Sequence, residues 1–198
     1  MSSFVTQSIL KVKKDRLKNM LDTLITSKTR LKLLLKFFLN GNNKSYLRGL
    51  ETEFGESSNA IRIELNRFED AGLLVSSTEG NKKIYQANKS NTIFGDIHNM
   101  LIKFVGIDEI IEKVLRRVGD LHSAYIIGDF ARGIDSPDID LVLAGDDIDQ
   151  SYVHTLIKKV ESHIHRKVHV QILKKEMVRD FLDNNKNLLI WKNGKQPQ

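Results

Sequence analysis

The stretch AYIIGDFARGIDSPDIDLVLAG, residues 124–145, constrains the fold of this chain more than any other. One apolar run ends at Gly128, a short polar segment follows, and Asp138 and Asp140 stand two residues apart inside a second apolar run. Apolar runs of this length, bounded by glycine and polar residues, are typical of buried strands. Because side chains alternate between the two faces of a strand, both carboxylates are expected on one face, about 7 Å apart.

The segments around this stretch alternate between helix and strand. Apolar residues at helical spacing predict helices at 110–118, 153–164 and 175–184, whereas KVHVQIL at 167–173 alternates as a strand does. This order over residues 107–198 predicts a small α/β sheet with helices on one face.

The two carboxylates point to metal chemistry. Asp138 and Asp140 can converge on a hard cation such as Mg²⁺, which prefers oxygen ligands and bridges to phosphates. Gly128 lets the backbone approach a phosphate closely, at the start of a helix whose N–H groups favour anions. Magnesium and a nucleotide are therefore the cofactors that this segment suggests.

Residues 107–175 resemble the polymerase-beta-like minimal nucleotidyltransferases, whose signature is Gly-Ser, a short helix often reading Ala-Arg-Gly, and Asp-x-Asp on a strand. The matching residues are Gly128, Ala131, Arg132, Gly133, Asp138 and Asp140. The resemblance implies nucleotide binding at Gly128, Asp129 and Arg132, and metal binding at Asp138 and Asp140.

Two departures from this family favour a domain that has lost most of its catalytic power. Asp129 replaces the family's serine, and its carboxylate would repel an incoming phosphate by about 1 to 4 kcal/mol per charge pair near 4 Å. The family places a third carboxylate on a following strand to activate the attacking hydroxyl, and the matching strand here carries His169 and Gln171. His169 is the candidate base, because histidine titrates near neutral pH.

The first half of the chain predicts four helices followed by a hairpin. The helices are indicated by Leu17, Met20, Leu21 and Leu24; by the stretch from the N-cap Ser27 to Asn40-Gly41; by Leu47, Leu50 and Phe54; and by Ile61, Leu65 and Phe68 after a cap at Ser57 or Ser58. After Gly72, residues 74–78 and 82–87 read as two strands joined by a turn at 79–81. Together these elements predict a winged helix-turn-helix.

The fourth helix has an outward face suited to reading DNA. Asn59, Arg62 and Asn66 project away from the apolar face and can contact base edges, and Lys82 and Lys83 lie near the hairpin tip, where phosphates can be met. Glu64 on this helix is unfavourable near phosphate. Ile63 lies beside the outward face, where a thymine methyl and a partner chain are both suitable contacts.

The segments TSKTRLKLLLKFFL, SSNAIRIELNRFEDAGLL and EGNKKIYQAN resemble winged-helix regulators of the arsenic-repressor type over roughly residues 20–90. The resemblance implies that Ser57, Ser58, Asn59, Arg62 and Asn66 enter the major groove. The cysteines with which some members sense metals are absent, so metal sensing is not implied.

The net charge differs between the two halves of the chain, for which different folds are predicted. Residues 1–106 carry 17 lysines and arginines against 10 acidic residues, whereas residues 107–198 carry 14 against 15. This asymmetry favours a polyanion partner, double-stranded DNA, for the first half, with protein docking as the alternative. We expect a winged-helix domain at 1–90, a connecting helix at 91–106 that either contributes to a homodimer or packs under the second domain, and a nucleotidyltransferase-like domain at 107–198.

The sequence thus predicts an α+β protein of two domains. The chain has no cysteine, no apolar run long enough to span a bilayer, and no apolar leader at its start, so a reducing cytoplasm without membrane partners is expected. The predicted function is transcriptional regulation, with the second domain as a sensor, dimerisation or scaffold module and a nucleotide as candidate effector. The alternative is an active magnesium-dependent nucleotidyltransferase whose winged helix delivers the substrate.

Overall fold

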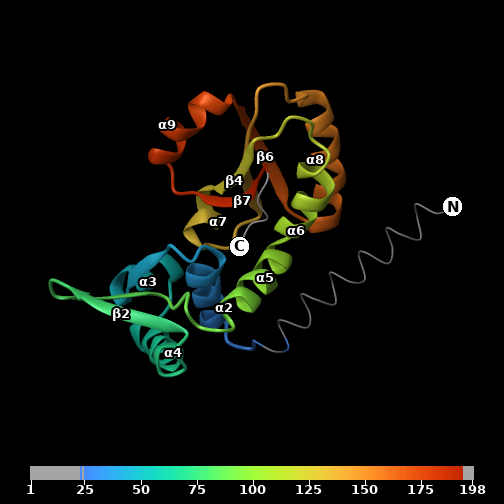
Figure 1. The fold of residues 1–198 in the computed structure, drawn as a ribbon. Coiled ribbons are helices and arrows are strands. Elements are labelled where there is room, and N and C mark those ends of the chain that lie inside the picture. Colours follow the sequence, from blue (N-terminus) through green and yellow to red (C-terminus); the bar gives the residue numbers. More distant parts are fainter. Residues whose placement is uncertain (1–22, 24, 194–198) are drawn as a thin grey trace. The chain divides into compact units, whose positions relative to one another are not determined.

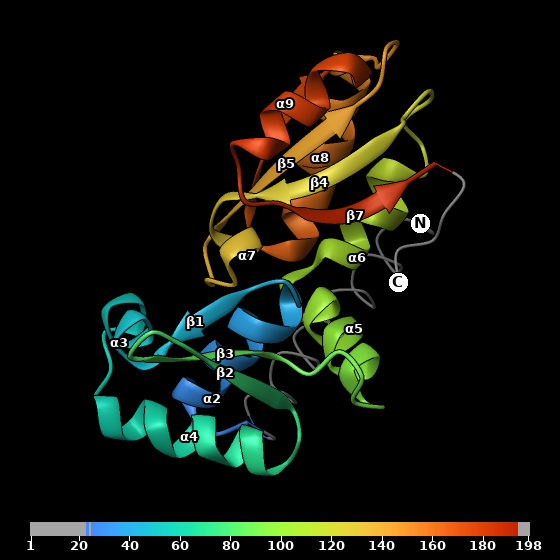
Figure 2. The same cartoon turned by 60° about the vertical axis from the view of Figure 1, so that its left-hand side comes forward.

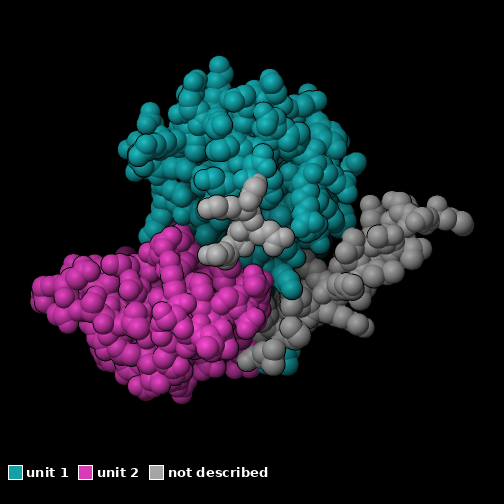
Figure 3. Space-filling view, viewed as in Figure 1, with its two compact units in different colours: residues 1–24, 102–131, 136–198 teal, residues 25–101, 132–135 magenta. Residues whose placement is uncertain are grey.

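The computed structural model describes residue 23 and residues 25–193, which divide into two compact units (Figure 1, Figure 3). Residues 25–101 with 132–135, magenta in Figure 3, form what is called the first unit below. The described residues of 102–131 and 136–198, teal in Figure 3, form the second unit. The predicted helix that begins near Leu17 lies outside the described residues, apart from Thr23.

The first unit is built on three helices whose ends follow from local sequence. Helix α2 (Lys28–Leu34) begins at Ser27, whose side chain accepts a hydrogen bond from the backbone N–H of Arg30, and it continues as the π-helical segment η1 (Leu35–Leu39). Helix α3 (Leu47–Phe54) ends at Gly55 in the left-handed region, where a residue without Cβ is favoured. Helix α4 (Ser58–Asp70) begins at Ser57.

A three-stranded antiparallel sheet forms the wing (Figure 2). Strands β2 (Leu74–Glu79) and β3 (Lys82–Ala87) pair with Glu79 opposite Lys82, so the turn is the two-residue Gly80-Asn81, one residue shorter than predicted. Strand β1 (Lys44–Tyr46) pairs with the other edge of β3 and was not predicted. Three helices followed by this wing confirm the winged helix-turn-helix.

The core of this unit is apolar and extends to the helix that follows the wing. The expected inner face of α4 is confirmed, because Ile61, Leu65 and Phe68 are all buried. The Phe38 ring meets Phe68 edge-on at 6.4 Å between centroids. Helix α5 (Phe94–Val105) follows the wing, and its His98 Nδ1 lies 2.9 Å from the Phe38 carbonyl oxygen.

The second unit contains a four-stranded mixed sheet of order β6-β5-β4-β7 (Figure 2). Its elements in chain order are α6 (Ile107–Ile110), η2 (Ile111–Leu115), β4 (Ser123–Ile127), α7 (Gly128–Arg132), β5 (Asp138–Ala144), α8 (Gln150–Ile164), β6 (Lys167–Leu173), η3 (Lys175–Met177), α9 (Val178–Asp183) and β7 (Leu188–Lys192). Only β5 and β6 are parallel, and α8 connects them. Strand β7 was not predicted.

Helices cover both faces of this sheet. Ala124, Ile126, Leu141 and Leu143 share one buried face, which α8 and η2 cover, while α9 lies on the opposite side (Figure 1). The expectation of helices on one face was therefore wrong, since the short helix after β6 returns across the other face. Helix α8, with 15 residues, is the longest of the described helices. No described helix is long and apolar enough to cross a membrane.

Candidate functional site

Helix α4 presents an exposed polar face opposite its buried one. Its exposed side chains include Asn59, Arg62, Ile63, Asn66 and Arg67. At about 100° per residue, Ile63 lies near the centre of this outward face, and it is 43% exposed. Ser57 caps the helix by accepting a hydrogen bond from the Ala60 N–H at 3.3 Å, whereas Ser58 is half-buried. Ser57 therefore stabilises the helix N-terminus.

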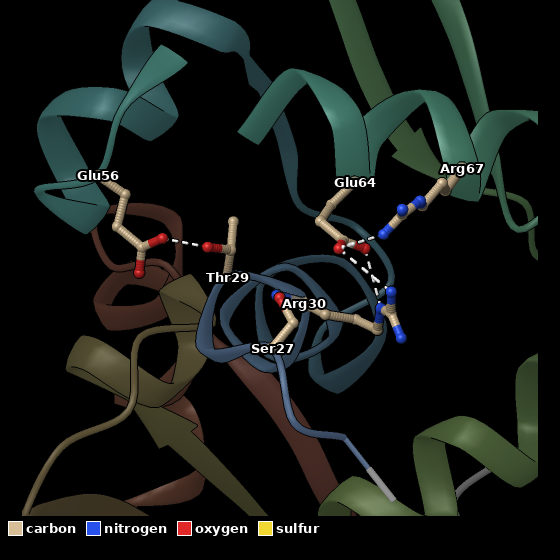
Figure 4. Close-up of polar contacts among 6 residues, drawn as sticks. All are labelled: Ser27, Thr29, Arg30, Glu56, Glu64 and Arg67. Carbon is tan, nitrogen blue, oxygen red and sulfur yellow. Dashed lines mark hydrogen bonds and ion pairs between the residues drawn. The ribbon is translucent and has the colours of Figure 1, made fainter. Parts of the chain in front are cut away.

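Glu64 does not belong to the outward face. Its carboxylate is only 5% exposed and accepts two hydrogen bonds from the Arg30 guanidinium of α2, at 2.9 and 3.1 Å (Figure 4). Arg67, one turn further along α4, donates a third at 2.9 Å. The expectation that Glu64 would oppose a nearby phosphate was wrong, because its charge is turned inward and compensated by two arginines.

The same pairing sets the protonation of this carboxylate. Burial opposes ionisation, but the hydrogen bonds from Arg30, followed by the charges of Arg30 and Arg67, outweigh it and hold the pKa of Glu64 below its ordinary value. The Glu64 hydrogen bonds in turn raise the pKa of Arg30. The pair is therefore ionised at neutral pH.

A second contact joins α2 to the residue that precedes the α4 cap. Glu56 accepts a hydrogen bond from the Thr29 hydroxyl (Figure 4) and another from Lys32 at 2.7 Å. These hydrogen bonds, that from Lys32 first, lower the pKa of Glu56. Helix α4 is thus tied to α2 both at its entry and near its middle, which fixes the direction of its outward face.

The two wing lysines differ in their surroundings. They are consecutive in β3, so they point to opposite faces of the hairpin. Lys82 Nζ lies 4.5 Å from the Tyr46 ring centroid, whereas Lys83 forms an ion pair with Glu69 at 2.7 Å, which raises the pKa of Lys83. Tyr46 was missed at the sequence level because the three residues of β1 are too few to show a strand period, and Glu69 of α4 was missed because its contact with Lys83 joins two different elements.

The structure places the two predicted metal ligands, Asp138 and Asp140, beside His169 at one end of the sheet of the second unit. Asp138 and Asp140 lie on one face of β5, and His169 is the register partner of Asp140 on β6. His169 Nε2 lies 3.1 Å from Asp138 Oδ1. Gly128 has φ +66°, and a Cβ at this position would lie only 2.3 Å from Asp140 Oδ2. Glycine is therefore required both by the backbone conformation and by the aspartate against it.

These residues fit a magnesium ion in part. Two carboxylates on one face suffice for Mg²⁺, which usually keeps several waters and takes its other ligands from phosphates. A third acidic ligand does not come from β6, whose side chains on this face are Lys167, His169 and Gln171. Within residues 25–193 no group of three or more acidic or histidine side chains is placed to hold a metal. Asp129 lies in the first turn of the short helix α7, and Arg132 is its last residue and is exposed.

Comparison with known proteins gives partial structural likenesses. No protein-family model matches the chain, and no curated protein matches it either. Reduced HlyU from Vibrio cholerae is 16% identical over 52% of this chain and 93% of its own, with a TM-score of 0.34. A candidate nucleotidyltransferase from Sulfolobus solfataricus is 28% identical over 46% of this chain and 81% of its own, with a TM-score of 0.34. The transcriptional regulator BldR from Sulfolobus solfataricus is 15% identical over 57% of this chain and 81% of its own, with a TM-score of 0.35.

The fold class follows from the chain's own topology. An N-terminal winged helix-turn-helix is followed by a small α/β sheet in which a short helix separates β4 from β5 and both aspartates begin β5. This second arrangement is the one that the nucleotidyltransferase resemblance implies. The protein is therefore an α+β protein with a winged helix and a nucleotidyltransferase-like sheet.

Replacing Glu64 by glutamine is expected to destabilise the winged-helix unit by about 1–2 kcal/mol at pH 7, because a buried acceptor of charged hydrogen bonds is lost. The pKa of Glu64 is lowered by folding, so its contribution is present above about pH 4.3 and disappears as the pH falls through the folded-state pKa. Urea unfolding followed by circular dichroism between pH 7 and pH 3 should show the two proteins converging in acid.

The matched control is Glu112→Gln, which removes an exposed i,i+4 partner of Arg116. Exposed pairs of this kind contribute little, so a change below about 0.5 kcal/mol is expected. A Glu64→Gln protein that unfolds at the same urea concentration as the wild type at pH 7 would contradict a stabilising role for the buried carboxylate.

Proposed function

We propose that this protein is a DNA-binding transcriptional regulator. The observation that carries the proposal is the sorting of charge on α4: the acid near its middle, Glu64, is buried and neutralised by arginines, while amide and guanidinium groups surround Ile63 on the exposed face and the exposed acid Asp70 lies at the last residue of the helix. Asn59, Arg62 and Asn66 are side chains that pair with the edges of adenine and guanine in the major groove. A helix that displays them, followed by a wing with two lysines, suits double-stranded DNA better than an apolar protein surface.

Ile63 has a role in this proposal. Exposure of a β-branched apolar side chain to water near the centre of a polar helix face costs free energy. This cost is removed if the side chain covers an apolar group of the partner. In the major groove the apolar group is the methyl of thymine. Flanked by Asn59 and Asn66, Ile63 would select a thymine next to the bases that those amides read.

The nucleotidyltransferase-like domain acts in this proposal as a sensor, dimerisation or scaffold module and not as an enzyme. His169 occupies the position that a third carboxylate would need, and it contacts Asp138, one of the two expected metal ligands. A nucleotide with Mg²⁺ is the candidate effector, with its phosphates beside the Gly128 backbone and its metal ion on Asp138 and Asp140. To regulate, it must bind the DNA-competent and incompetent states with different affinities.

A homodimer in the cytoplasm completes the proposal. Winged-helix regulators commonly bind two half-sites about one helical turn apart, which requires two copies of the reading helix.

The distribution of charge also supports DNA as the partner. Residues 1–106 contain 17 lysines and arginines but only 10 acidic residues, and a domain that binds phosphates needs such an excess of positive charge.

Arg62→Ala and Lys82→Ala are expected to weaken DNA binding in different ways. Arg62→Ala should cost about 1–3 kcal/mol on a preferred duplex and little on an unrelated one, because it removes a base contact. Lys82→Ala should weaken binding to both duplexes alike and reduce the slope of log affinity against log salt by about 1. Fluorescence anisotropy at several salt concentrations measures both, on duplexes selected from a random pool. Equal losses from both substitutions on every duplex would contradict this division of roles.

Deoxyuridine tests the role of Ile63, because it lacks only the thymine methyl. Replacing the contacted thymine in the selected duplex should weaken wild-type binding by about 0.8 kcal/mol, roughly fourfold. The Ile63→Ala protein should bind both duplexes equally, whereas Asn66→Ala, the control, should retain the preference. A wild-type protein indifferent to deoxyuridine at every thymine of the site would exclude the methyl contact.

The alternative function, active nucleotidyl transfer, is favoured by the retained geometry of Gly128, Asp138 and Asp140. Under our proposal, incubation with labelled nucleotides, Mg²⁺ and nucleic-acid or protein acceptors yields no labelled product. His169→Asp should strengthen Mn²⁺ binding, measured by paramagnetic resonance, by supplying a third carboxylate. Label transferred by the wild type and abolished by Asp138→Asn would instead establish the enzyme.

A further inference from the structure

The end of α4 is tied to the wing by a single carboxylate. Glu69 is the second-last residue of α4, and its side chain is 30% exposed. One oxygen of its carboxylate accepts a hydrogen bond from the Ser76 hydroxyl at 2.5 Å, and the other accepts one from Lys83 Nζ at 2.7 Å. Both oxygens of Glu69 are therefore engaged by the hairpin that follows the helix.

The two wing residues of this contact lie on the same face of the hairpin. Ser76 on β2 is opposite Tyr85 on β3, and Lys83 precedes Tyr85 by two residues, so all three side chains share one face. The hydrogen bond from Lys83, followed by that from Ser76, lowers the pKa of Glu69. The hydrogen bond to Glu69 in turn raises the pKa of Lys83. Both groups are ionised at neutral pH, and each compensates the charge of the other.

The neighbouring lysine, Lys82, points to the opposite face of the hairpin, where its Nζ lies 4.5 Å from the Tyr46 ring centroid. Glu79 is its partner in the register, yet within residues 25–193 Lys82 takes part in no ion pair. The two wing lysines therefore differ in what they offer to a phosphate. Lys82 offers a positive charge, whereas Lys83 together with Glu69 is a neutral pair.

The position of Glu69 makes its charge matter for DNA binding. Glu69 follows Arg62 by seven residues, which is two helical turns less about 20°, so the two side chains leave α4 in nearly the same direction about 10 Å apart. An unpaired carboxylate in line with a base-reading arginine would repel the phosphates of the duplex. The pairing with Lys83 offsets this repulsion, as the two arginines do for Glu64.

We propose that Glu69 and Lys83 act as one neutral unit at the DNA interface, an inference that rests on the DNA-binding function proposed above. Lys83 compensates Glu69 and neutralises no phosphate, so Lys82 is the wing lysine that contacts the DNA backbone. Glu69 is a positioning residue: through Ser76 and Lys83 it holds the wing at the end of the reading helix.

The salt dependence of DNA binding tests this assignment, measured by fluorescence anisotropy of the full-length protein on a duplex selected from a random pool. Each phosphate that a lysine neutralises adds about 0.9 to the magnitude of the slope of log affinity against log salt. Lys83→Ala should weaken binding about twofold without changing the slope, because it leaves Glu69 unpaired but removes no phosphate contact. Glu69→Gln should strengthen binding about two- to fivefold and steepen the slope by about 0.9, because Lys83 is freed for a phosphate.

The double variant separates charge compensation from a structural role. Glu69→Gln with Lys83→Ala replaces a neutral pair by neutral side chains, so both affinity and slope should return to the wild-type values. A pair that only stabilised the wing would leave the double variant as weak as the weaker single variant. The pair is partly exposed, so each variant should keep the circular dichroism spectrum and nearly the melting temperature of the wild type.

Asp70→Asn is the matched control, because it removes the adjacent, exposed carboxylate at the end of the same helix. The change in net charge equals that of Glu69→Gln, but no lysine is freed, so the slope should stay at the wild-type value.

Three results would overturn the proposal: a slope reduced by Lys83→Ala as much as by Lys82→Ala, equal slopes for Glu69→Gln and Asp70→Asn, or a double variant that does not regain wild-type binding. Any of these in a protein that binds the selected duplex refutes the neutral pair alone. A wild-type protein that binds no duplex at any salt concentration refutes the DNA-binding function and this inference together.

Discussion

A carboxylate held out of water between two arginines fixes which face of α4 is exposed at the surface. Buried ion pairs add little net stability, because desolvation offsets most of the attraction, but they penalise arrangements that leave one charge unpaired. Rotation of α4 by one residue, about 100°, would separate Glu64 from Arg30 and expose part of the apolar stripe. The arrangement of Asn59 and Asn66 on the surface therefore follows from a contact on the opposite side of the helix.

In the second unit the polar and charged side chains gather at the two ends of the sheet. Asp138 and Asp140 lie at one end of β5, where Asp140 packs against Gly128, a glycine that tolerates no side chain, and where His169 is the neighbour of Asp140 on β6. At the other end of β4, a cavity of about 290 Å³ is lined by two cations, Lys175 and Arg179, by one carboxylate, Asp183, and by apolar side chains.

Most local features could be predicted from the sequence, because they depend on neighbours in the chain. The caps at Ser27 and Ser57 follow from the hydrogen bond that a serine at a helix start accepts. The stripe of Ile61, Leu65 and Phe68 follows from a period of 3.6, and the shared face of Asp138 and Asp140 from a period of 2. Long-range pairing was not predictable in this way. Strand β1 has three residues and no readable period, and β7 pairs with a strand that ends some 60 residues earlier.

The residues of the candidate sites also differ in whether they could be predicted from local sequence or depend on long-range contacts. The outward residues of α4 were found from periodicity, but Glu64 lies at the edge of the buried arc, where a charge is read as exposed unless its partner on another helix is known. The cavity was invisible for a related reason: Ser123 and Arg179 belong to segments that meet only when α9 returns across the sheet. Side chains that act together across an interface leave no local signature.

The position of β7 has a consequence for synthesis of the chain. Strand β4 lies inside the sheet between β5 and β7, so one of its edges stays unpaired until residues 188–192 have been made. The helices and wing of the first unit, drawn from residues 28–87, precede all of these strands. On the ribosome the winged helix can fold early, whereas the sheet waits with an exposed edge that favours association between nascent chains.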